Sequence, residues 1–570
     1  RVRRIRRPLN NLPAPLARRV ATASPARHPL SIYGAVSPSR PACTRRRKRF
    51  VHSRQFHSDE RNHPLPHLED RQPVPPGSAR ENEPVHCLQD ALRRHRYLLR
   101  MLRLASLGAT ARVSWRYSSR PFTMARPRCL ADGVWLRMNV LILTIGTRGD
   151  VQPHIALGVG LSDAGHEVTI CTSPRYRALF EDRGPVFAPL SDDIVALVES
   201  AEGRAAIEDM SSLVSGLTAT TRLLRRHGNI QRDLVRDAWA AAADVEPDII
   251  VYHPKMASGL HFAEKLEIPA VIAPLYPLFL PTAAYPNLGL APLNLGTSLT
   301  RAYNRGTHRI VRSIVRGIST RYFSDWRAEH GLLPLSRGHG ILRDGTGRAA
   351  VFMNAWSEHV APNPPDWPDD VETTGYWFLD SRQDWTPPPD LAAFLDDGPP
   401  PVYVGFGSMA SRHPERTTQL VLDAVAQSGA RAILASGWGG LTPDDVPDSV
   451  FRLEDAPHDR LFPRCAAVVH HGGAGTTAAG LRAGRPTVIC PFFGDQPFWG
   501  RRVHELGAGP EPIPQKKLTA SKLASAIQAA TETPSIRESA RDLGRRIREE
   551  DGVGRAIQHL TTLVSSASPE

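Results

Sequence analysis

The stretch "CAAVVHHGGAGTTAAGLRAGRPTVICPFFGDQ", residues 465–496, decides the fold. An apolar run leads into two histidines and a glycine-rich loop, and an alanine-rich segment and a second apolar run follow. This order predicts a strand, a loop, a helix and another strand. Glycines let the backbone approach a ligand closely, and the free N–H groups at a helix start attract an anion. The stretch therefore predicts an α/β lobe with an anion site at the start of a helix.

The same alternation of strands and helices fills the chain from residue 138 onward. The runs "NVLILTIG" (139–146) and "DIIVYH" (248–253) are typical of buried strands, and a helical pattern follows each of them. A proline-rich segment, 362–401, then precedes a second series of strands that begins with "VYVGFGSM". Strands that alternate with helices predict parallel sheets covered on both faces. We expect an α/β fold with two Rossmann-like lobes and a cleft between them, with ligands at the carboxyl ends of the strands.

The positive charge of the chain is confined to its first quarter. The formal net charge is +14, yet residues 1–137 hold 29 Lys and Arg against 8 Asp and Glu, and the remaining residues hold 42 against 49. Residues 1–137 also lack sustained apolar periodicity, so we expect a disordered basic extension or upstream sequence that is foreign to the native protein. The predicted domains are 1–137, 138–375 and 376–570. A nucleic-acid-binding role is confined to the extension and is not expected of the folded body.

Cysteine usage and hydropathy limit the compartment. The six cysteines show no CxxC or zinc-ligand spacing, and Cys171 and Cys490 lie in apolar runs, which favours buried thiols in a reducing compartment. No window offers 18 uninterrupted apolar residues, and the most apolar segment, 268–293, is rich in proline. We expect a cytoplasmic protein without a spanning helix.

The glycine loop has two possible interpretations. The first is a diphosphate cradle, in which Thr476 and Thr477 add hydroxyl donors at the helix start and His471 donates to a phosphate oxygen. The second is a dinucleotide site, because Gly473 and Gly475 satisfy the GxGxxG/A pattern. The loop, however, follows three other strands of its lobe, whereas nicotinamide fingerprints usually open a lobe. A second glycine-bearing strand end, "VYVGFGSM", also favours the cradle.

Several motifs in order resemble one family. The run from "VYVGFGSM" through "HHGGAGTT" to "PFFGDQPFWGRRV" resembles the donor lobe of family 1 glycosyltransferases of the GT-B fold. The segments "TIGTRGDVQPHIALG", "YHPKMASGLHFAEKLEIPAVIAP" and "TTGYWFLD" are similar to the sterol 3-beta-glucosyltransferase branch. The resemblance covers nearly all of residues 138–530. It implies an acceptor-binding lobe (138–375) and a nucleotide-sugar-binding lobe with C-terminal helices (376–570).

The resemblance also implies roles for individual residues. Asp495 and Gln496 would bind hydroxyls of the donor sugar, and Trp438, Pro457 and His458 would border the nucleotide. The remaining donor-binding residues would hold the diphosphate: Gly407, Ser408, His471, Gly473, Gly475, Thr476 and Thr477. Two positions depart from the plant pattern, because Asp455 stands where a stacking tryptophan is found and Ala479 stands where a ribose-binding glutamate is found. Uridine is the expected base, and thymidine stays open.

Transfer of a sugar to an alcohol also requires a base for the hydroxyl. Asp150 follows the first strand and is the first candidate, and His154, one turn further, is the second. The alternative role for Asp150 is a helix N-cap ahead of Pro153, and the two roles are compatible. Residues 138–570 contain no Asp-x-Asp, so we expect no metal and no cofactor besides the UDP-sugar co-substrate. Attack on the face opposite the leaving group would invert the anomeric centre.

The acceptor side is predicted from composition. The apolar and aromatic segment 268–293 suits a flat lipophilic acceptor such as a sterol, or else an ordinary buried loop. Beyond it, five arginines spaced four, four, three and four residues apart fall on one helical face, and Ile310, Ile314 and Ile318 line another. Such a helix either presents a solvated face or lies on an anionic membrane. The five arginines are Arg301, Arg305, Arg309, Arg312 and Arg316.

The function expected from the sequence is therefore an inverting, metal-independent glycosyltransferase that moves a hexose, glucose first, from a UDP-sugar to a lipophilic alcohol. Within the enzyme class, the alternative is an antibiotic or macrolide aglycone glycosyltransferase that uses a dTDP- or UDP-sugar. A more distant alternative is a nicotinamide-dependent oxidoreductase built on the same glycine loop.

Overall fold

The computed structural model describes residues 137–193, 196, 200, 228–288, 290–335, 342–381, 385–406, 414–435 and 446–567. All of them fall in one compact unit, which spans residues 122–570. The predicted basic extension lies outside the described residues, apart from its last residue, Arg137.

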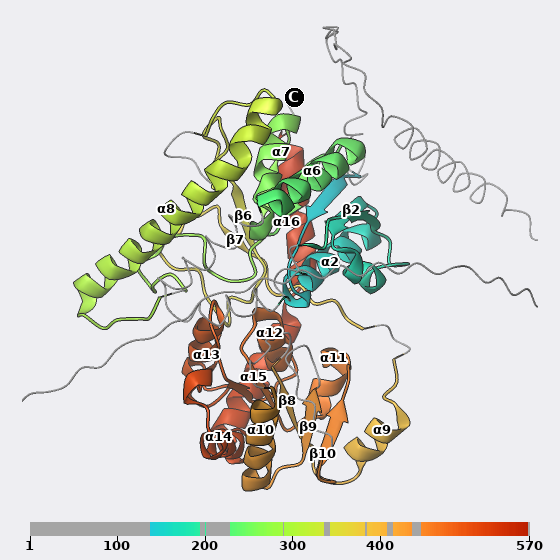
Figure 1. The fold of residues 1–570 in the computed structure, drawn as a ribbon, viewed down its shortest axis with the longest axis vertical. Helices are drawn as coiled ribbons and strands as arrows, with labels where there is room; N and C mark the ends of the chain where they lie inside the picture. Colours follow the sequence, from blue (N-terminus) through green and yellow to red (C-terminus); the bar gives the residue numbers. More distant parts are fainter. Residues whose placement is uncertain are drawn as a thin grey trace, which may run out of the picture. The chain divides into compact units, whose positions relative to one another are not determined.

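Seven parallel strands form the first sheet, in the order β3-β2-β1-β4-β5-β6-β7. Figure 1 labels β2, β6 and β7 of this sheet. Alternate residues of β1 enter the cores on opposite faces, since Val140 and Ile142 pack in one and Leu141 and Leu143 in the other. A parallel sheet needs such cover on both faces. The strands are β1 (Asn139–Leu143), β2 (Glu167–Thr172), β3 (Val186–Pro189), β4 (Ile249–Tyr252), β5 (Ala270–Ile272), β6 (Val351–Asn354) and β7 (Glu372–Thr373). The helices are α2 (Arg148–Asp163), η1 (Pro174–Leu179), α6 (Gly228–Val245), η2 (Pro254–Met256), α7 (Ser258–Leu266) and α8 (Thr297–Glu329).

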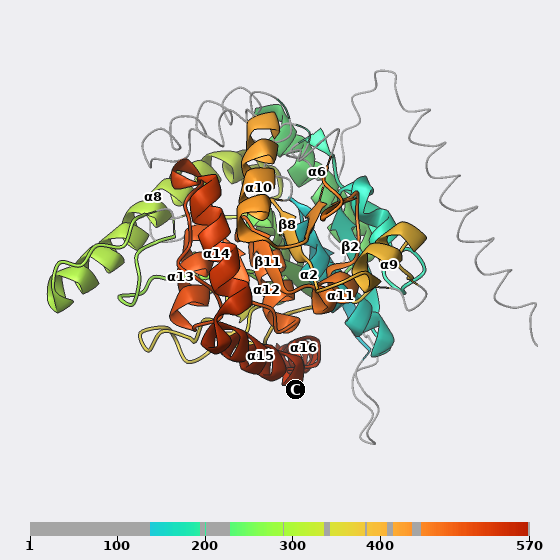
Figure 2. The same cartoon turned by 90° about the horizontal axis from the view of Figure 1, so that it is seen from below.

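Five parallel strands form the second sheet, in the order β10-β9-β8-β11-β12. Helices α10 and α14 lie side by side against it (Figure 2). The strands are β8 (Val402–Gly405), β9 (Ala432–Ala435), β10 (Val450–Leu453), β11 (Ala467–His470) and β12 (Thr487–Ile489). The helices are α9 (Pro389–Asp396), α10 (Pro414–Ser428), α11 (His458–Leu461), η3 (Phe462–Arg464), α12 (Ala474–Arg482), α13 (Gln496–Glu505), η4 (Gln515–Lys517), α14 (Ala520–Glu532), α15 (Pro534–Glu549) and α16 (Gly552–Ala567).

Both sheets reverse their strand order at one point, and these points place the site. In the first sheet the order reverses between β1 and β4, where Leu143 lies opposite Tyr252. In the second sheet it reverses between β8 and β11, where Gly405 lies opposite His470. Ligands of open α/β sheets bind at the carboxyl ends of strands at such switch points. The predicted base follows β1 and the predicted cradle follows β11.

The last helix joins the two halves of the chain. Helix α16 follows the second sheet in sequence, yet its residues Ala556, Leu560 and Val564 belong to the core of the first sheet. It packs along α2, where Gly160 leaves room for Val553, because a Cβ at Gly160 would collide with that side chain. The predicted domain boundary between residues 375 and 376 stays a prediction. Helix α16, however, packs on the first lobe, although by sequence it belongs to the second predicted domain.

The structure also bears on the predictions for the cysteines, for the arginine-bearing helix and for membrane-spanning helices. Cys171, Cys465 and Cys490 are buried free thiols, as expected for the first and the last of them. The predicted arginine helix is confirmed as part of α8, with Arg316 half-buried and the other four arginines exposed. None of the helices in the described part of the chain combines the length and the apolarity that crossing a bilayer requires.

The packing of α16 can be tested by one deletion in the core. Leu560→Ala removes a fully buried side chain and is expected to lower the free energy of unfolding by about 2–5 kcal/mol. Gln558→Ala changes an exposed residue of the same helix and should have little effect. Denaturant titration followed by circular dichroism measures both. Equal stability of the two variants would contradict the docking of α16 on the first lobe.

Candidate active site

Asp150 is fixed at the start of α2 by its N-cap. Thr147 precedes the helix and donates its backbone N–H to Asp150 Oδ2 at 2.8 Å and its hydroxyl to the same oxygen at 2.9 Å. A short polar cap followed three residues later by an acid is the pattern of a capping box. The N-cap role considered for Asp150 from the sequence is therefore wrong, because Thr147 is the N-cap and Asp150 is its partner in the first turn of the helix. The capping box holds a carboxylate at the carboxyl end of β1.

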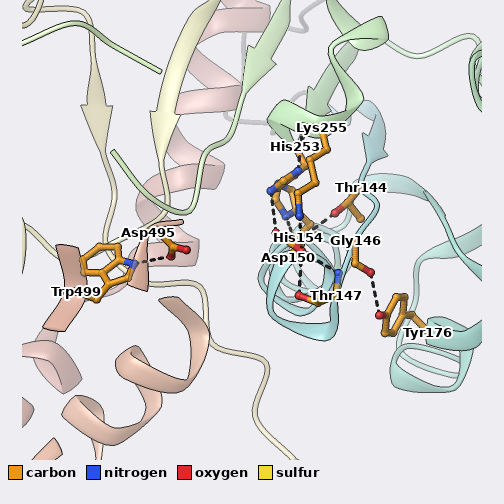
Figure 3. A network of polar contacts seen from close by, with 10 residues as sticks. All are labelled: Thr144, Gly146, Thr147, Asp150, His154, Tyr176, His253, Lys255, Asp495 and Trp499. Atoms are coloured by element: carbon orange, nitrogen blue, oxygen red, sulfur yellow. Dashed lines mark hydrogen bonds and ion pairs between the residues drawn. The ribbon is translucent and has the colours of Figure 1, made fainter. Parts of the chain in front are cut away.

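Two residues that follow β4 complete the surroundings of this carboxylate (Figure 3). Lys255 Nζ donates to Asp150 Oδ2 at 2.7 Å, and His253 Nε2 lies 3.5 Å from Asp150 Oδ1. Both residues lie in the segment "YHPK", and the sequence alone predicted no role for them. The available signal was their position, because β1 and β4 are neighbours at the switch point and their ends meet.

The contacts set the charge of Asp150. Burial opposes ionisation, but the Lys255 ammonium, the neighbouring His253 and the hydrogen bonds from Lys255 and Thr147 lower the pKa of Asp150 to about 2. Oδ2 accepts three hydrogen bonds, whereas among the described residues only His253 approaches Oδ1. Asp150 is thus a carboxylate with one engaged oxygen and one less engaged oxygen. Gly146, with φ of +132°, leaves the space in which the carboxylate and Lys255 meet.

The two histidines behind Asp150 are neutral. His253 Nδ1 accepts the N–H of Lys255 at 3.1 Å, so the ring proton of the neutral form sits on Nε2, toward Asp150. Burial lowers the pKa of His253 well below its usual value. His154 is fully buried and donates Nδ1–H to the carbonyl of Asp150 at 2.9 Å, and burial lowers its pKa to about 4. Its ring packs edge-on against His253 and Trp377.

The predicted glycine loop lies between β11 and α12. Gly472 adopts φ of +91°, and a Cβ there would come within 2.6 Å of Ile489 Cγ2, so only glycine fits. Its N–H donates to Nδ1 of the buried His470 at 2.9 Å, which turns the chain after the strand. Gly473 is the N-cap of α12, and the His471 ring lies close against it. Burial lowers the pKa of His471 to about 4, so its neutral ring carries one N–H that can donate.

The two threonines of the loop differ in what they touch. Thr477 is fully buried, and its hydroxyl donates to the Gly473 carbonyl at 2.9 Å, within the helix. Thr476 is half-buried in the first turn of α12. The helix start therefore offers the backbone N–H groups of its first turn and the Thr476 hydroxyl.

Asp495 and Gln496 start helix α13. Asp495 is its N-cap and accepts the indole N–H of Trp499 at 2.8 Å. Burial raises the pKa of Asp495 to about 6, and the charge of Asp150 adds to this rise. In Figure 3 the Asp495 carboxylate lies between Trp499 and the Asp150 network. Gln496 is buried, and its side-chain oxygen accepts the N–H of Phe492 at 2.8 Å, which shapes the loop before the helix.

The starts of α2 and α12 face one another. A Cβ at Gly475 would lie 3.7 Å from Gly149 Cα, so the first turns of the two helices nearly touch. Beside them, Arg148 of α2 reaches Asp455 of the second lobe, with 3.6 Å between Nη1 and Oδ1. Tyr276, from the predicted acceptor segment, is close enough to Asp150 and Asp495 for their charges to raise its pKa further above the value that burial sets. The structure therefore brings residues of both lobes together around Asp150.

The predicted nucleotide contacts are described in part. Pro457 is the N-cap of α11, and His458 stacks on Phe462 with 4.3 Å between ring centroids. Burial and the nearby Arg148 lower the pKa of His458 to about 4. Gly407, Ser408 and Trp438 lie outside the described residues. Within the described part of the chain, no three His, Cys, Asp or Glu side chains gather closely enough to hold a metal ion.

The different contacts of the two threonines give a matched test. Thr476→Val should weaken UDP binding by roughly tenfold, because it removes a hydroxyl available to a charged phosphate. Thr477→Val should weaken UDP binding less, since that hydroxyl already donates to the Gly473 carbonyl. Isothermal titration calorimetry with UDP measures both variants against the wild type. Equal losses in the two variants would place the diphosphate elsewhere.

Two family models match the two halves of the chain. Residues 140–285 match the glycosyltransferase family 28 N-terminal domain, and residues 419–551 match the erythromycin biosynthesis protein CIII-like C-terminal domain. The first match contains Asp150, and the second contains the glycine loop.

Solved structures support the same architecture. The glycosyltransferase of kitacinnamycin aligns with a TM-score of 0.56 at 18% identity, over 75% of this chain and 99% of that one. The calicheamicin glycosyltransferase CalG4 aligns with a TM-score of 0.52 at 19% identity, over 76% of this chain and 100% of that one. At these identities the likeness concerns the fold alone, and it confirms the predicted GT-B architecture.

Relatives of higher identity show the family. A sterol 3-beta-glucosyltransferase of Arabidopsis thaliana is 35% identical over 450 residues, which are 76% of this chain and 68% of the relative. The sterol 3-beta-glucosyltransferase of Aspergillus clavatus is 38% identical over 436 residues, which are 74% of this chain but only 29% of that longer protein. The chain therefore belongs to the sterol 3-beta-glucosyltransferase family, and it is a glycosyltransferase.

Proposed function

We propose that the chain is an inverting, metal-independent enzyme that transfers a hexose, glucose in the first instance, from a UDP-sugar to the hydroxyl of a sterol or a similar lipophilic alcohol. The observation that carries this proposal is the meeting of the α2 and α12 starts, with Gly475 next to Gly149 and Asp150 one residue further. A leaving anion on one helix start then lies within reach of a base on the other.

In the proposed reaction, Asp150 Oδ1 accepts the proton of the acceptor hydroxyl. The acceptor oxygen forms a bond to the anomeric carbon of the donor while the bond from that carbon to the diphosphate oxygen breaks. The electron pair of the broken bond leaves with UDP. Attack from the face opposite the leaving group converts an α-linked donor to a β-glycoside. Oδ2 stays bonded to Lys255 and Thr147, which keeps the carboxylate oriented during the proton transfer.

The diphosphate is held by groups that need no metal. The free N–H groups and the positive dipole end of α12 stabilise its charge, and Thr476 and His471 add donors. Asp495 is placed to accept hydrogen bonds from hydroxyls of the donor sugar. Its pKa of about 6 leaves it largely ionised at neutral pH, and Trp499 fixes its orientation.

Two lines of support point to a lipophilic acceptor. The relatives of higher identity carry the name sterol 3-beta-glucosyltransferase. The segment after β5 also brings apolar and aromatic side chains toward the same place, since Tyr276 lies near Asp150 and Tyr285 packs on Phe498 of α13 with 5.3 Å between ring centroids. A flat apolar molecule with one hydroxyl suits such surroundings.

The proposal is tested by product formation with defined substrates. The full chain is incubated with a sterol and either UDP-glucose or dTDP-glucose, with and without EDTA, and the glycoside and the free nucleotide are measured. We expect a β-glucoside from UDP-glucose at a rate that EDTA leaves unchanged. Preference for dTDP-glucose, or transfer only to polyketide alcohols, would favour the antibiotic-type alternative. Loss of activity in EDTA would refute metal independence.

Asp150→Asn tests the base directly. The amide keeps the size of the side chain but cannot take the proton, so kcat should fall by about 10²–10⁴-fold while UDP still binds. His154→Asn serves as the comparison and should keep most of the activity, because His154 is fully buried behind Asp150 and its Nδ1–H is already bonded to the Asp150 carbonyl. If Asp150→Asn keeps wild-type kcat, the base has been assigned to the wrong residue.

The ion pair between Lys255 and Asp150 should affect the pH dependence of kcat/KM. A base works only when deprotonated, so activity falls as the pH drops through its pKa, which is about 2 for Asp150. Lys255→Met removes the positive charge, and the acid limb of kcat/KM should move up by about one to three pH units. Lys255→Arg keeps the charge and should show a much smaller movement.

Other titratable groups near Asp150 could also affect the pH profile, so the experiment needs a control for them. Asp495 has a pKa of about 6, and Asp495→Asn in the Lys255→Met background separates its titration from that of Asp150. His253, His154 and Tyr276 also face the carboxylate, and burial keeps all three neutral. Because Asp495, with its pKa of about 6, can set the acid limb in both enzymes, the comparison is made between Asp495→Asn and Asp495→Asn/Lys255→Met. An acid limb that does not move between these two variants would show that Lys255 does not govern the base.

A further inference from the structure

Exposed apolar side chains gather at one place on the described part of the chain. Six large hydrophobic residues are exposed in the whole described part of the chain, and four of these six lie between residues 293 and 310. They are Leu293 (43% exposed), Leu295 (49%), Leu299 (66%) and Ile310 (54%). Leu299 and Ile310 are three helical turns apart, so they share one edge of α8.

The loop that carries the first leucines is held against the helix. The Thr300 hydroxyl accepts the N–H of Leu295 at 2.9 Å and donates to the carbonyl of Leu293 at 3.3 Å. The Tyr303 hydroxyl donates to the carbonyl of Ala291 at 2.9 Å. These bonds fix the backbone while residues 291–299 stay exposed. The leucines are therefore displayed to solvent by a defined structure.

Arginines line the other edge of the exposed face of α8. Arg301, Arg309 and Arg312 are exposed, and Arg305 pairs with Asp366 at 3.3 Å. Gly306 lies between the two edges and Gly317 lies on the edge of Leu299 and Ile310, and a Cβ at either glycine would meet no atom within 4 Å. No Asp or Glu occurs from residue 268 to residue 324. We call the set Leu293, Leu295, Leu299, Ile310, Arg301, Arg309 and Arg312 the leucine–arginine surface.

The leucine–arginine surface adjoins the acceptor segment. Thr307 accepts the N–H of Asn287 at 2.9 Å, and Asn304 donates to the carbonyl of Ala283 at 2.8 Å. His308 contacts the carbonyl of Tyr285 at 3.2 Å, and the Tyr285 ring packs on Phe498 beside Asp495. These hydrogen bonds thus connect the inner face of α8 to the acceptor segment, whose Tyr276 lies near Asp150. In Figures 1 and 2 the first turns of α8 extend outward from the other helices.

We propose that the leucine–arginine surface docks on an anionic lipid bilayer, so that the enzyme takes its acceptor from the membrane. The leucines would enter the interface between headgroups and acyl chains, and the arginines would pair with lipid phosphates and carboxylates. Charge complementarity favours this occupant over a second copy of the chain, because a copy would bring a surface of the same charge. The inference rests on the proposed function for the identity of the acceptor, but the docking is measured independently.

Vesicle binding of full-length variants tests the surface. Arg301→Gln/Arg309→Gln/Arg312→Gln should partition on the order of a hundredfold less well than the wild type into phosphatidylcholine–phosphatidylserine vesicles at low salt. Leu295→Ser/Leu299→Ser/Ile310→Ser should lose partition at all salt concentrations. Arg452→Gln/Arg541→Gln/Arg546→Gln removes equal charge from exposed arginines elsewhere, and Val186→Ser removes an apolar residue that is 63% exposed. Both controls should partition like the wild type.

Measurements of sterol glucosylation distinguish a failure of the docking inference from a failure of the proposed function. All variants share the basic residues 1–137, so their common contribution to vesicle binding cancels in the comparison. The surface variants should glucosylate sterol delivered in cyclodextrin at the wild-type rate and sterol in vesicles at a rate reduced in proportion to binding. Absence of turnover with every form of sterol would count against the function only. The docking inference is overturned if the surface variants and the controls partition equally, or if the leucine variant converts a dimeric wild type into a monomer.

Discussion

The ion pair between Asp150 and Lys255 is the interaction on which the site depends. It forms because β1 and β4 are neighbours at the point where the strand order of the first sheet reverses, so the loops that follow them meet. Gly146 provides the space, Thr147 orients the carboxylate and His253 covers its second oxygen. A buried carboxylate without these partners would hold a proton, whereas with them it stays ionised.

The second constraint is the close approach of two helix starts. The α2 and α12 starts both present free N–H groups and positive dipole ends, and such ends repel unless negative charge lies between or beside them. Asp150 supplies that charge on α2, and a diphosphate would supply it on α12. Glycines at positions 149 and 475 permit the approach, since side chains there would separate the helices. The same geometry favours an anion at the start of α12, and in the proposed reaction this anion would lie next to Asp150, the proposed base.

The sequence predicted the parts of the site that are local. Strand–loop–helix patterns are written in consecutive residues, so the sequence predicted the glycine loop that leads into α12 at Gly473 and the position of Asp150 near the start of a helix, although the N-cap of that helix is Thr147. It did not predict Lys255 and His253, because they are more than 100 residues from Asp150 and become neighbours only through strand pairing. The sequence also predicted the same role for Thr476 and Thr477, as hydroxyl donors to the diphosphate. In the structure, however, the buried hydroxyl of Thr477 already donates to a backbone carbonyl.

The amino-acid sequence by itself determined the two α/β lobes, the family resemblance and the loop that can bind an anion, since periodicity, glycine position and helix capping act between near neighbours. Only the tertiary structure decided the ionisation of Asp150, the exposure of leucines beside arginines on α8 and the return of α16 to the first lobe. Each of these depends on which distant side chains exclude water or supply charge, and burial and electrostatic fields are properties of the packed chain.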